Sequence, residues 1–321
     1  MNYPKPLRTG ATVGLICPSS PISPERAAQC RAVMEQLGFR VKMADNLTHN
    51  QGGYMAGDGQ TRSSWINRMF ADPEVEAIFC IRGGYGGIRA LENLDLDLIK
   101  ANPKIFVGYS DVTSFHLLFN QQCGLVTFHG PMVSSNLVDD LDEDSKCSLF
   151  QALCTEEAYQ FKNPAGCPLQ VLQKGRGAGP LVGGNLSLLC ASLATPYEVD
   201  TRGKIFFIEE VGETVSRMDR LVYQLKNAGK FQDCAGILLG QFTQCPNENM
   251  PDYTELQLFQ EALEGIAVPV LYNIQSGHGN PNLTLPLGAH CTVDTSSTSI
   301  CFDVQKTLSC KTTAPSPGAL T

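Results

Sequence analysis

Residues 104–112, KIFVGYSDV, read as an apolar strand that ends in a tight turn and continues into a helix, and this order decides the fold class. The same alternation runs through the whole first half of the chain. Further strands are predicted at residues 11–17, 40–44 and 77–81, and helices at residues 24–37, 59–70, 88–94 and 112–121. Apolar strands that alternate with helices indicate a parallel sheet covered on both faces. The first half is therefore predicted to be an open α/β domain.

The second half mixes helices and strands less regularly. Helices are predicted at residues 187–193, 218–228 and 254–263, and strands at residues 204–208, 236–239 and 269–274. The last two apolar segments, residues 290–294 and 299–303, are expected to pair as a hairpin. This pattern predicts a mixed α/β domain.

The pattern is weakest between residues 139 and 179, where acidic residues, prolines and glycines surround one short predicted helix at residues 147–155. Such a composition is typical of a connection between domains. We therefore expect four segments: an N-terminal α/β domain over 1–145, a connection over 146–178, a C-terminal domain over 179–311 and a flexible tail over 312–321.

Composition excludes several classes of partner. The net charge is −8 and no run of Lys or Arg occurs, so we expect no nucleic-acid partner. The first apolar run, residues 11–17, stops at Pro18, so neither a signal peptide nor a membrane helix is expected. The 13 cysteines form no C-x-x-C pair, which favours reduced thiols and a cytoplasmic location.

The turn in residues 104–112 contains the first candidate catalytic residue. Gly108 stands two positions before Ser110, as in a nucleophile elbow, although Val112 replaces the second glycine of G-x-S-x-G. A serine at a strand-to-helix junction is also a common helix N-cap. Asp111 could take that capping role equally well, which would leave Ser110 available as a nucleophile.

A glycine-rich loop, residues 82–87 (RGGYGG), follows the predicted strand at 77–81. Glycines let backbone N–H groups come close to an anion, so the loop could bind an oxyanion. Neither the P-loop spacing nor the dinucleotide spacing is present. The alternative is an ordinary tight turn.

Two glutamates, Glu209 and Glu210, follow the apolar strand at 204–208. Open α/β sheets bind ligands at the carboxyl ends of their strands, which is where these carboxylates are expected. Alternatively, they are solvated or pair with Arg217 or Arg220 on the next helix.

His278 has the most suggestive setting of the five histidines, because Gly277 and Gly279 on either side leave its ring free to be aimed. His129 is the second choice. No H-E-x-x-H motif, His/Cys cluster or calcium loop occurs, so we expect neither a metal nor a cofactor.

Seven motifs together resemble the L,D-carboxypeptidase family of serine peptidases, which includes muramoyl-tetrapeptide carboxypeptidases and microcin C immunity peptidases. The resemblance spans residues 6–305. The motifs that carry it are Cys17-Pro18-Ser19-Ser20-Pro21, Met55-Ala56-Gly57-Asp58, Arg82-Gly83-Gly84-Tyr85-Gly86, Gly108-Tyr109-Ser110-Asp111, Gly183-Gly184-Asn185-Leu186, Phe207-Ile208-Glu209-Glu210 and Gly277-His278-Gly279.

The resemblance implies a Ser-Glu-His triad of Ser110, Glu209 and His278, with Glu210 as the alternative acid. Because the serine lies in the N-terminal domain and the other two in the C-terminal domain, the active site is expected at the interface between the domains. The implied reaction is hydrolysis of the L,D peptide bond that releases the terminal D-alanine from a murein tetrapeptide. The family is often dimeric, so a homodimer is also expected.

We expect the backbone N–H groups of Gly84 and Asp111 to form the oxyanion hole and Arg82 to bind the substrate carboxylate. Two alternatives remain open at this level. One is a microcin C-type detoxifying peptidase or amidase, disfavoured because Trp65 is the only tryptophan available to stack on a nucleobase. The other is a non-catalytic ligand-binding module in which Ser110 merely caps a helix.

Overall fold

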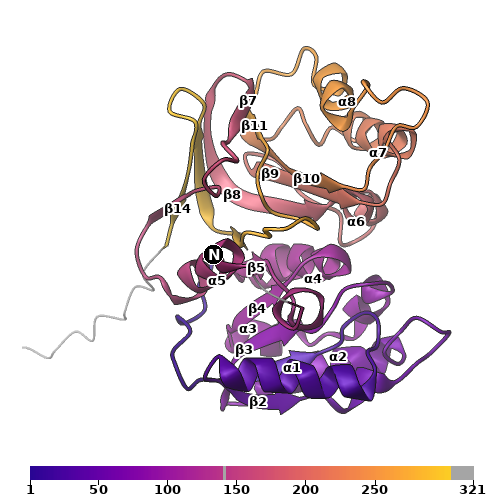
Figure 1. Cartoon of the computed structure of the whole chain (residues 1–321), viewed down its shortest axis with the longest axis vertical. Coiled ribbons are helices and arrows are strands. Elements are labelled where there is room, and N and C mark those ends of the chain that lie inside the picture. The colour runs from indigo at the N-terminus through magenta and orange to yellow at the C-terminus, as the bar shows by residue number, and fades with distance from the viewer. Residues whose placement is uncertain (140–141, 305–321) are drawn as a thin grey trace, which may run out of the picture.

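The structure is a computed structural model that describes residues 1–139 and 142–304, so the predicted tail at 312–321 lies outside the described residues. Two sheets, each with its own helices, form the lower and upper parts of the molecule in Figure 1. The first half of the chain builds the lower part and the second half most of the upper part. The predicted α/β class is confirmed.

The first sheet has six strands in the order β12-β5-β4-β3-β1-β2. Five of them are parallel: β1 (Thr12–Ile16), β2 (Arg40–Met43), β3 (Val75–Cys80), β4 (Ile105–Gly108) and β5 (Thr127–His129). The sixth, β12 (Leu285–Leu287), comes from the C-terminal half and runs antiparallel to β5. The purely parallel sheet that the pattern predicted is therefore completed by an antiparallel edge strand from the other half.

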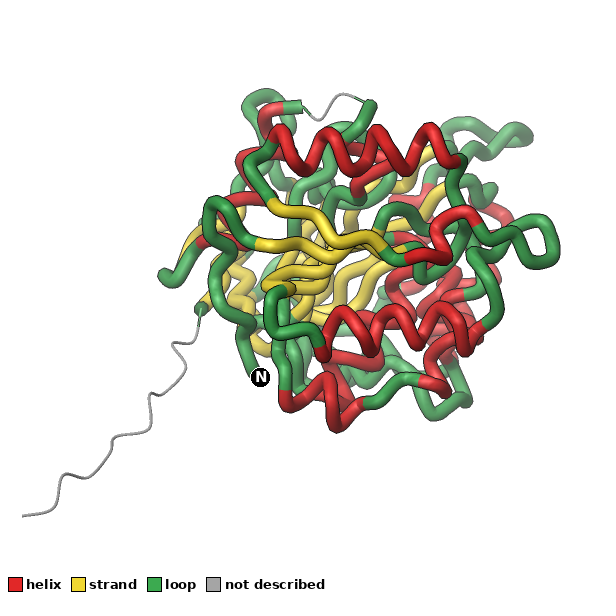
Figure 2. Tube along the Cα trace, turned by 90° about the horizontal axis from the view of Figure 1, so that it is seen from below, coloured by secondary structure: helices red, strands yellow, loops and turns green. Residues whose placement is uncertain are grey.

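Helices cover both faces of this sheet (Figure 2). The helices are α1 (Pro24–Gln36), α2 (Gly59–Ala71), α3 (Leu96–Ala101), α4 (Thr113–Leu118) and α5 (Glu143–Cys154). The chain reverses its direction across the sheet after β2, and right-handed crossovers then place α1 on one face and α2, α3 and α4 on the other. Helix α5 lies on the α1 side, where its Phe150 stacks on Phe39, which follows α1. Ser23 and Asp58 cap α1 and α2 through their side chains. Both helices lie within one residue of their predicted bounds.

Short turns of other helix types complete the first half. The predicted helix at 88–94 is a 3₁₀ helix, η2 (Gly87–Asn93). The predicted helix at 112–121 consists of a 3₁₀ turn, η3 (Ser110–Val112), then α4, then a π-helical turn, η4 (Phe119–Cys123). Two further turns are η1 (Asp45–Thr48) and η5 (Val133–Leu137).

The second sheet has eight strands in the order β6-β14-β13-β8-β9-β10-β11-β7. Its central strands are parallel: β8 (Arg176–Asn185), β9 (Ile205–Val211), β10 (Gly236–Thr243) and β11 (Val270–Tyr272). Antiparallel strands flank them: β6 (Tyr159–Phe161), β7 (Gln170–Gln173), β13 (His290–Asp294) and β14 (Ser299–Asp303). The hairpin of β13 and β14 is confirmed. The helices of this part are α6 (Leu186–Ser192), α7 (Val215–Asn227) and α8 (Glu255–Ala262).

The glycine-rich start of β8 was expected to be a connection. Instead, a Cβ on Gly177 would stand 1.8 Å from the Ala235 carbonyl oxygen, and one on Gly179 would stand 2.1 Å from that of Gly203. Glycine therefore allows this strand to lie against neighbouring backbone, although glycine is depleted in strands and gave no strand signal. Strands β6 and β7, within the expected connection, also join the second sheet.

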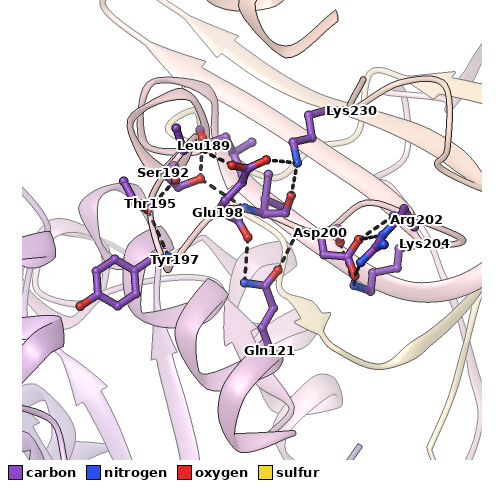
Figure 3. A network of polar contacts seen from close by, with 12 residues as sticks. Gln121, Leu189, Ser192, Thr195, Tyr197, Glu198, Asp200, Arg202, Lys204 and Lys230 are labelled. Atoms are coloured by element: carbon purple, nitrogen blue, oxygen red, sulfur yellow. Dashed lines mark hydrogen bonds and ion pairs between the residues drawn. The ribbon is translucent and has the colours of Figure 1, made fainter. Parts of the chain in front are cut away.

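The two halves are joined near the start of β9 by the network in Figure 3. The Gln121 side chain, from η4, accepts a hydrogen bond from the Asp200 N–H at 2.7 Å and donates one to the Glu198 carbonyl oxygen at 3.1 Å. Lys230 forms an ion pair with Glu198 and donates to the Val199 carbonyl oxygen. These contacts hold the segment that leads into β9, and with it the position of β9 relative to the first half. Within residues 1–139 and 142–304, no helix combines the length and apolarity needed to cross a bilayer.

Candidate active site

Ser110 lies at the end of β4 in the left-handed backbone region, with φ = +66°. This conformation costs a non-glycine residue about 1–3 kcal/mol and is concentrated at functional sites. Its hydroxyl caps no helix: the 3₁₀ turn there has Tyr109 at its N-cap position and no side-chain cap. Gly108 provides the space for the turn, because a Cβ there would stand 2.9 Å from the Val112 side chain. The geometry is that of a nucleophile elbow.

Asp111 does not act as an N-cap either, but holds the glycine-rich loop in place. Its buried carboxylate accepts hydrogen bonds from the Ser19 hydroxyl at 2.5 Å and the Gly87 N–H at 2.7 Å. Burial raises the pKa of Asp111, which these two hydrogen bonds oppose. Gly83 is packed against the serine: a Cβ there would stand 3.1 Å from the Ser110 Oγ. The loop is therefore a packed wall of the site and not merely an exposed turn.

Arg62 holds the same loop from the other side. Its side chain is buried, and it donates to the carbonyl oxygens of Pro18 at 2.7 Å, Gly86 at 2.8 Å and Gly57 at 3.1 Å. One guanidinium thus joins three loops that follow β1, β3 and η1. Burial lowers the pKa of Arg62, while the nearby Asp111 carboxylate opposes this effect.

Glu209 and His278 form a hydrogen-bonded pair. Glu209 lies fully buried near the end of β9, and its Oε2 is 2.7 Å from Nδ1 of His278. Burial raises the pKa of Glu209, and the His278 ring opposes this shift. The His278 ring also packs edge-on against Tyr109, with the centroids 4.8 Å apart. The loop that carries the histidine therefore meets the residue directly before Ser110.

Glu210 has different surroundings. Its carboxylate accepts hydrogen bonds from the Asn185 side chain at 2.8 Å and from the N–H and hydroxyl of Ser187 at 2.8 and 2.6 Å. It therefore anchors the start of α6. Neither glutamate is solvated, since both are buried, and Arg217 pairs with Glu213.

The Gly183-Gly184-Asn185 motif brings β8 close to both β9 and the elbow helix. A Cβ on Gly183 would stand 1.9 Å from the Phe207 carbonyl oxygen, and one on Gly184 would stand 2.5 Å from the Thr113 hydroxyl. The Asn185 N–H donates to that hydroxyl at 3.1 Å. The motif therefore fixes how the two halves meet behind the site.

His129, the second-choice histidine, is fully buried beneath Tyr109, with ring centroids 5.8 Å apart. Neither ring nitrogen has a hydrogen-bond partner among the described residues. Burial lowers its pKa well below the ordinary value, so the ring is neutral. Its ring nitrogens therefore make no hydrogen bond to Glu209 or Ser110.

Comparison with known proteins decides the family. Residues 13–130 match the LD-carboxypeptidase N-terminal domain and residues 178–293 the LD-carboxypeptidase C-terminal domain. The probable murein peptide carboxypeptidase of Bacillus subtilis is 40% identical over 298 residues, which cover 92% of both chains. This chain belongs to the LD-carboxypeptidase family. The family is one of serine peptidases, which gives the chain its enzyme class.

Other members of the LD-carboxypeptidase family are similar over nearly the whole chain. The murein tetrapeptide carboxypeptidase of Pseudomonas aeruginosa is 28% identical and covers 86% of this chain, which covers 91% of that protein. The structure of the microcin C7 self-immunity protein MccF superposes with a TM-score of 0.87 at 25% identity, covering 95% of this chain and 99% of that one. The fold is thus the two-domain fold of these carboxypeptidases.

In this member of the LD-carboxypeptidase family, the structure brings Glu209 and His278 together and packs Tyr109, beside Ser110, against the His278 ring. Gly84 is backed by Ser20, whose hydroxyl would stand 2.1 Å from a Cβ at position 84. Arg82 is exposed at the start of the loop. Among the described residues, no group of three or more His, Cys, Asp or Glu side chains is arranged to hold a metal ion.

Two residues that shape this LD-carboxypeptidase site were missed by the sequence analysis. Arg62 lies on the same face of α2 as the buried Ile66 and Met69. A charged residue on an apolar helix face was therefore the sequence signal that could have indicated its buried role. Gln241 holds the His278 loop by accepting from the Gly279 N–H at 2.8 Å and donating to the Pro281 carbonyl oxygen at 2.9 Å. Nothing in the sequence around Gln241 indicates that role.

Proposed function

We propose that this chain is a serine carboxypeptidase that cuts the L,D peptide bond of a murein tetrapeptide and releases the terminal D-alanine. The observation that carries the proposal is the hydrogen bond between the buried Glu209 and His278, whose ring packs on the residue before a serine with φ = +66°. A member of the LD-carboxypeptidase family with this arrangement has the parts of a Ser-His-acid triad. We further propose a cytoplasmic homodimer as the working form.

In the proposed reaction, the Ser110 Oγ attacks the carbonyl carbon of the third residue while His278 takes the serine proton. Because Nδ1 of His278 is bonded to Glu209, the proton goes to Nε2. His278 then returns that proton to the departing amine of D-alanine as the C–N bond breaks. Water, activated by the same ring, hydrolyses the acyl-serine ester and restores the enzyme. Glu209 holds the required tautomer and stabilises the charged ring.

The proposed oxyanion hole is formed by the glycine-rich loop, residues 82–87, together with the turn that carries Ser110. The N–H of Asp111, the residue after the nucleophile, and the N–H of Gly84 are the proposed donors to the oxyanion. Asp111 and Arg62 hold the loop of Gly84 from two sides through Gly87 and Gly86. Loss of one such donor typically raises the barrier by about 2.7–4 kcal/mol. Arg82, exposed beside this loop, is proposed to bind the terminal carboxylate of the substrate.

The murein peptide is proposed as the substrate because of the names of two related proteins. They are named as murein peptide and murein tetrapeptide carboxypeptidases. The alternative is the microcin-type substrate suggested by the relative MccF. Trp65, the only tryptophan, lies on α2 with the Arg68 guanidinium over its ring, which favours the murein peptide because the ring is already covered. A binding module without catalysis is disfavoured, since Ser110 caps no helix.

The test is release of D-alanine from a murein L,D-tetrapeptide by the purified chain and by Ser110→Ala. We expect release by the wild type and none by the variant. Aspartyl sulfamoyl adenosine, bound by MccF in a solved structure, is the comparison substrate. Hydrolysis of this compound without any release of D-alanine would replace the murein proposal with the microcin-type one. Hydrolysis of neither would remove the catalytic proposal for both substrates.

A further inference from the structure

A cavity of about 370 Å³ lies at the carboxyl ends of β10 and β11, beside the first turn of α8. Its lining includes Gly279 and Asn280, the two residues that directly follow His278. It also includes Gln241 on β10. Strand β10 lies beside β9, which carries Glu209, and the next residues along the two strands, Phe242 and Glu210, are paired. The cavity and the Glu209–His278 pair therefore share one edge of the sheet, where open α/β sheets bind ligands.

Carboxamide side chains dominate the polar part of this cavity: Gln170, Gln241, Asn273, Gln275 and Asn280. Several are already connected, since Gln241 donates to Gln275 at 3.3 Å and Gln275 donates to Asn273 at 2.7 Å. Asn280 makes no side-chain hydrogen bond to any described residue, so its amide is available to a ligand. Four apolar side chains provide a surface for methylene groups: Leu239, Phe242, Leu256 and Phe259.

Glu255 is the one charged side chain in the lining, which contains no Lys, Arg or His. It is the first residue of α8, where an acidic side chain interacts favourably with the helix dipole. Within residues 1–139 and 142–304, no cation forms an ion pair with it. The cavity therefore has a negative charge without a protein counterion, which favours a cationic ligand and disfavours a neutral or anionic one.

We propose that this cavity is a substrate subsite for an ammonium-bearing side chain, that of a diamino acid at the third position of the tetrapeptide. This residue carries the carbonyl that Ser110 attacks. Glu255 would pair with the ammonium group, the carboxamides would bind the adjoining polar groups, and the apolar wall would contact the methylenes. The inference rests on the proposed carboxypeptidase activity and adds a residue that determines its specificity.

The test compares two tetrapeptides that differ only at the third residue, which is L-lysine in one and Nε-acetyl-L-lysine in the other. We expect the wild type to favour the lysine peptide in kcat/KM by about tenfold or more, since a charge-assisted hydrogen bond contributes 1.5–3 kcal/mol. Glu255→Gln should lose most of this preference, through a lower kcat/KM for the lysine peptide. Glu261→Gln is the matched control, because Glu261 lies on the same helix and accepts from the Tyr253 hydroxyl. A preference that survives in Glu255→Gln overturns the proposal.

Binding measurements separate this inference from the proposed reaction. Calorimetry on Ser110→Ala, with and without Glu255→Gln, uses the same two peptides and requires no turnover. If the wild type hydrolyses neither peptide, the catalytic proposal fails on its own. Tighter binding of the lysine peptide that Glu255→Gln abolishes would still support the subsite. Equal binding of both peptides to Ser110→Ala would overturn it.

Discussion

Nδ1 of His278 lies 2.7 Å from Oε2 of Glu209, although the two residues are 69 positions apart in the chain. Glu209 stands near the end of β9, and His278 follows β11, which is separated from β9 by β10 alone. The carboxylate has no solvent exposure and makes one hydrogen bond through Oε2, while Oε1 has no partner among the described residues. The pair therefore depends on a single contact, which makes it easy to test.

Glu209→Gln should lower kcat by about 1,000- to 10,000-fold if Glu209 is the triad acid as proposed, because an amide at that place favours the wrong tautomer of the histidine. The fold should remain intact, since the side chain keeps its size. Steady-state D-alanine release and a thermal melt measure both effects.

Glu210→Gln is the matched control and should show the opposite pattern. Its carboxylate accepts three hydrogen bonds from Asn185 and Ser187, so the amide should cost about 1–3 kcal/mol of unfolding free energy. Its kcat should fall less than tenfold. A large loss of kcat in Glu210→Gln with little loss in Glu209→Gln would make Glu210 the triad acid.

Ser110→Gly should be more stable than Ser110→Ala by about 1 kcal/mol, because glycine adopts φ = +66° without strain and alanine keeps the strained Cβ. Both variants should release no D-alanine. Urea unfolding of the two proteins side by side measures the difference. Equal stabilities would show that the elbow stores no strain at this residue.

Arg62→Met should lower the unfolding free energy by about 3 kcal/mol or more, because buried carbonyl oxygens of Pro18, Gly57 and Gly86 lose their donor. It should also lower kcat, since the glycine-rich loop loses one of the side chains that hold it in place. Arg68→Met is the control: this exposed residue on the same helix stacks on Trp65, and its loss should cost under about 1 kcal/mol. Similar effects of the two substitutions in urea unfolding would contradict the role given to Arg62.

His116 should make the protein less stable as the pH falls. Burial lowers its pKa from 6.5 to about 4, and the ring bonds to the Thr127 hydroxyl and the Gly108 carbonyl oxygen. Below pH 6.5 the unfolded chain protonates this ring while the folded chain does not, so unfolding takes up a proton. The stability is complete above pH 6.5 and should fall by on the order of 3 kcal/mol by pH 4.

The measurement for His116 is urea unfolding of the wild type and His116→Gln at pH 7, 5.5 and 4.5. Because other groups titrate in both proteins, the difference between the two pH profiles isolates this ring. The variant should lose less stability than the wild type over this range. Parallel profiles would show that the ring has the same pKa in the folded and the unfolded protein.

Local patterns predicted the elements that carry their own signals. Helices α1 and α2 begin at Ser23 and Asp58, whose side chains cap them, and the hairpin of β13 and β14 follows its alternating residues. Strand β8 could not be predicted in this way, because its glycines are explained only by the backbone that lies against them. Strand β12, three residues long, joins a sheet built by the other half of the chain, which no local pattern indicates.

The sequence by itself determined the α/β class, the serine at a strand-to-helix turn, the glycine-rich loop, and the placing of Glu209 near the end of one apolar strand and of His278 after another. Each of these depends on the backbone preferences and polarity of neighbouring residues, which a short stretch of sequence contains. Only the tertiary structure decided that Glu209 meets His278 while Glu210 anchors α6, and that Arg62 joins three loops. These contacts join residues far apart in the chain, and buried polar groups choose their partners from whatever the packed sheets bring within hydrogen-bonding distance.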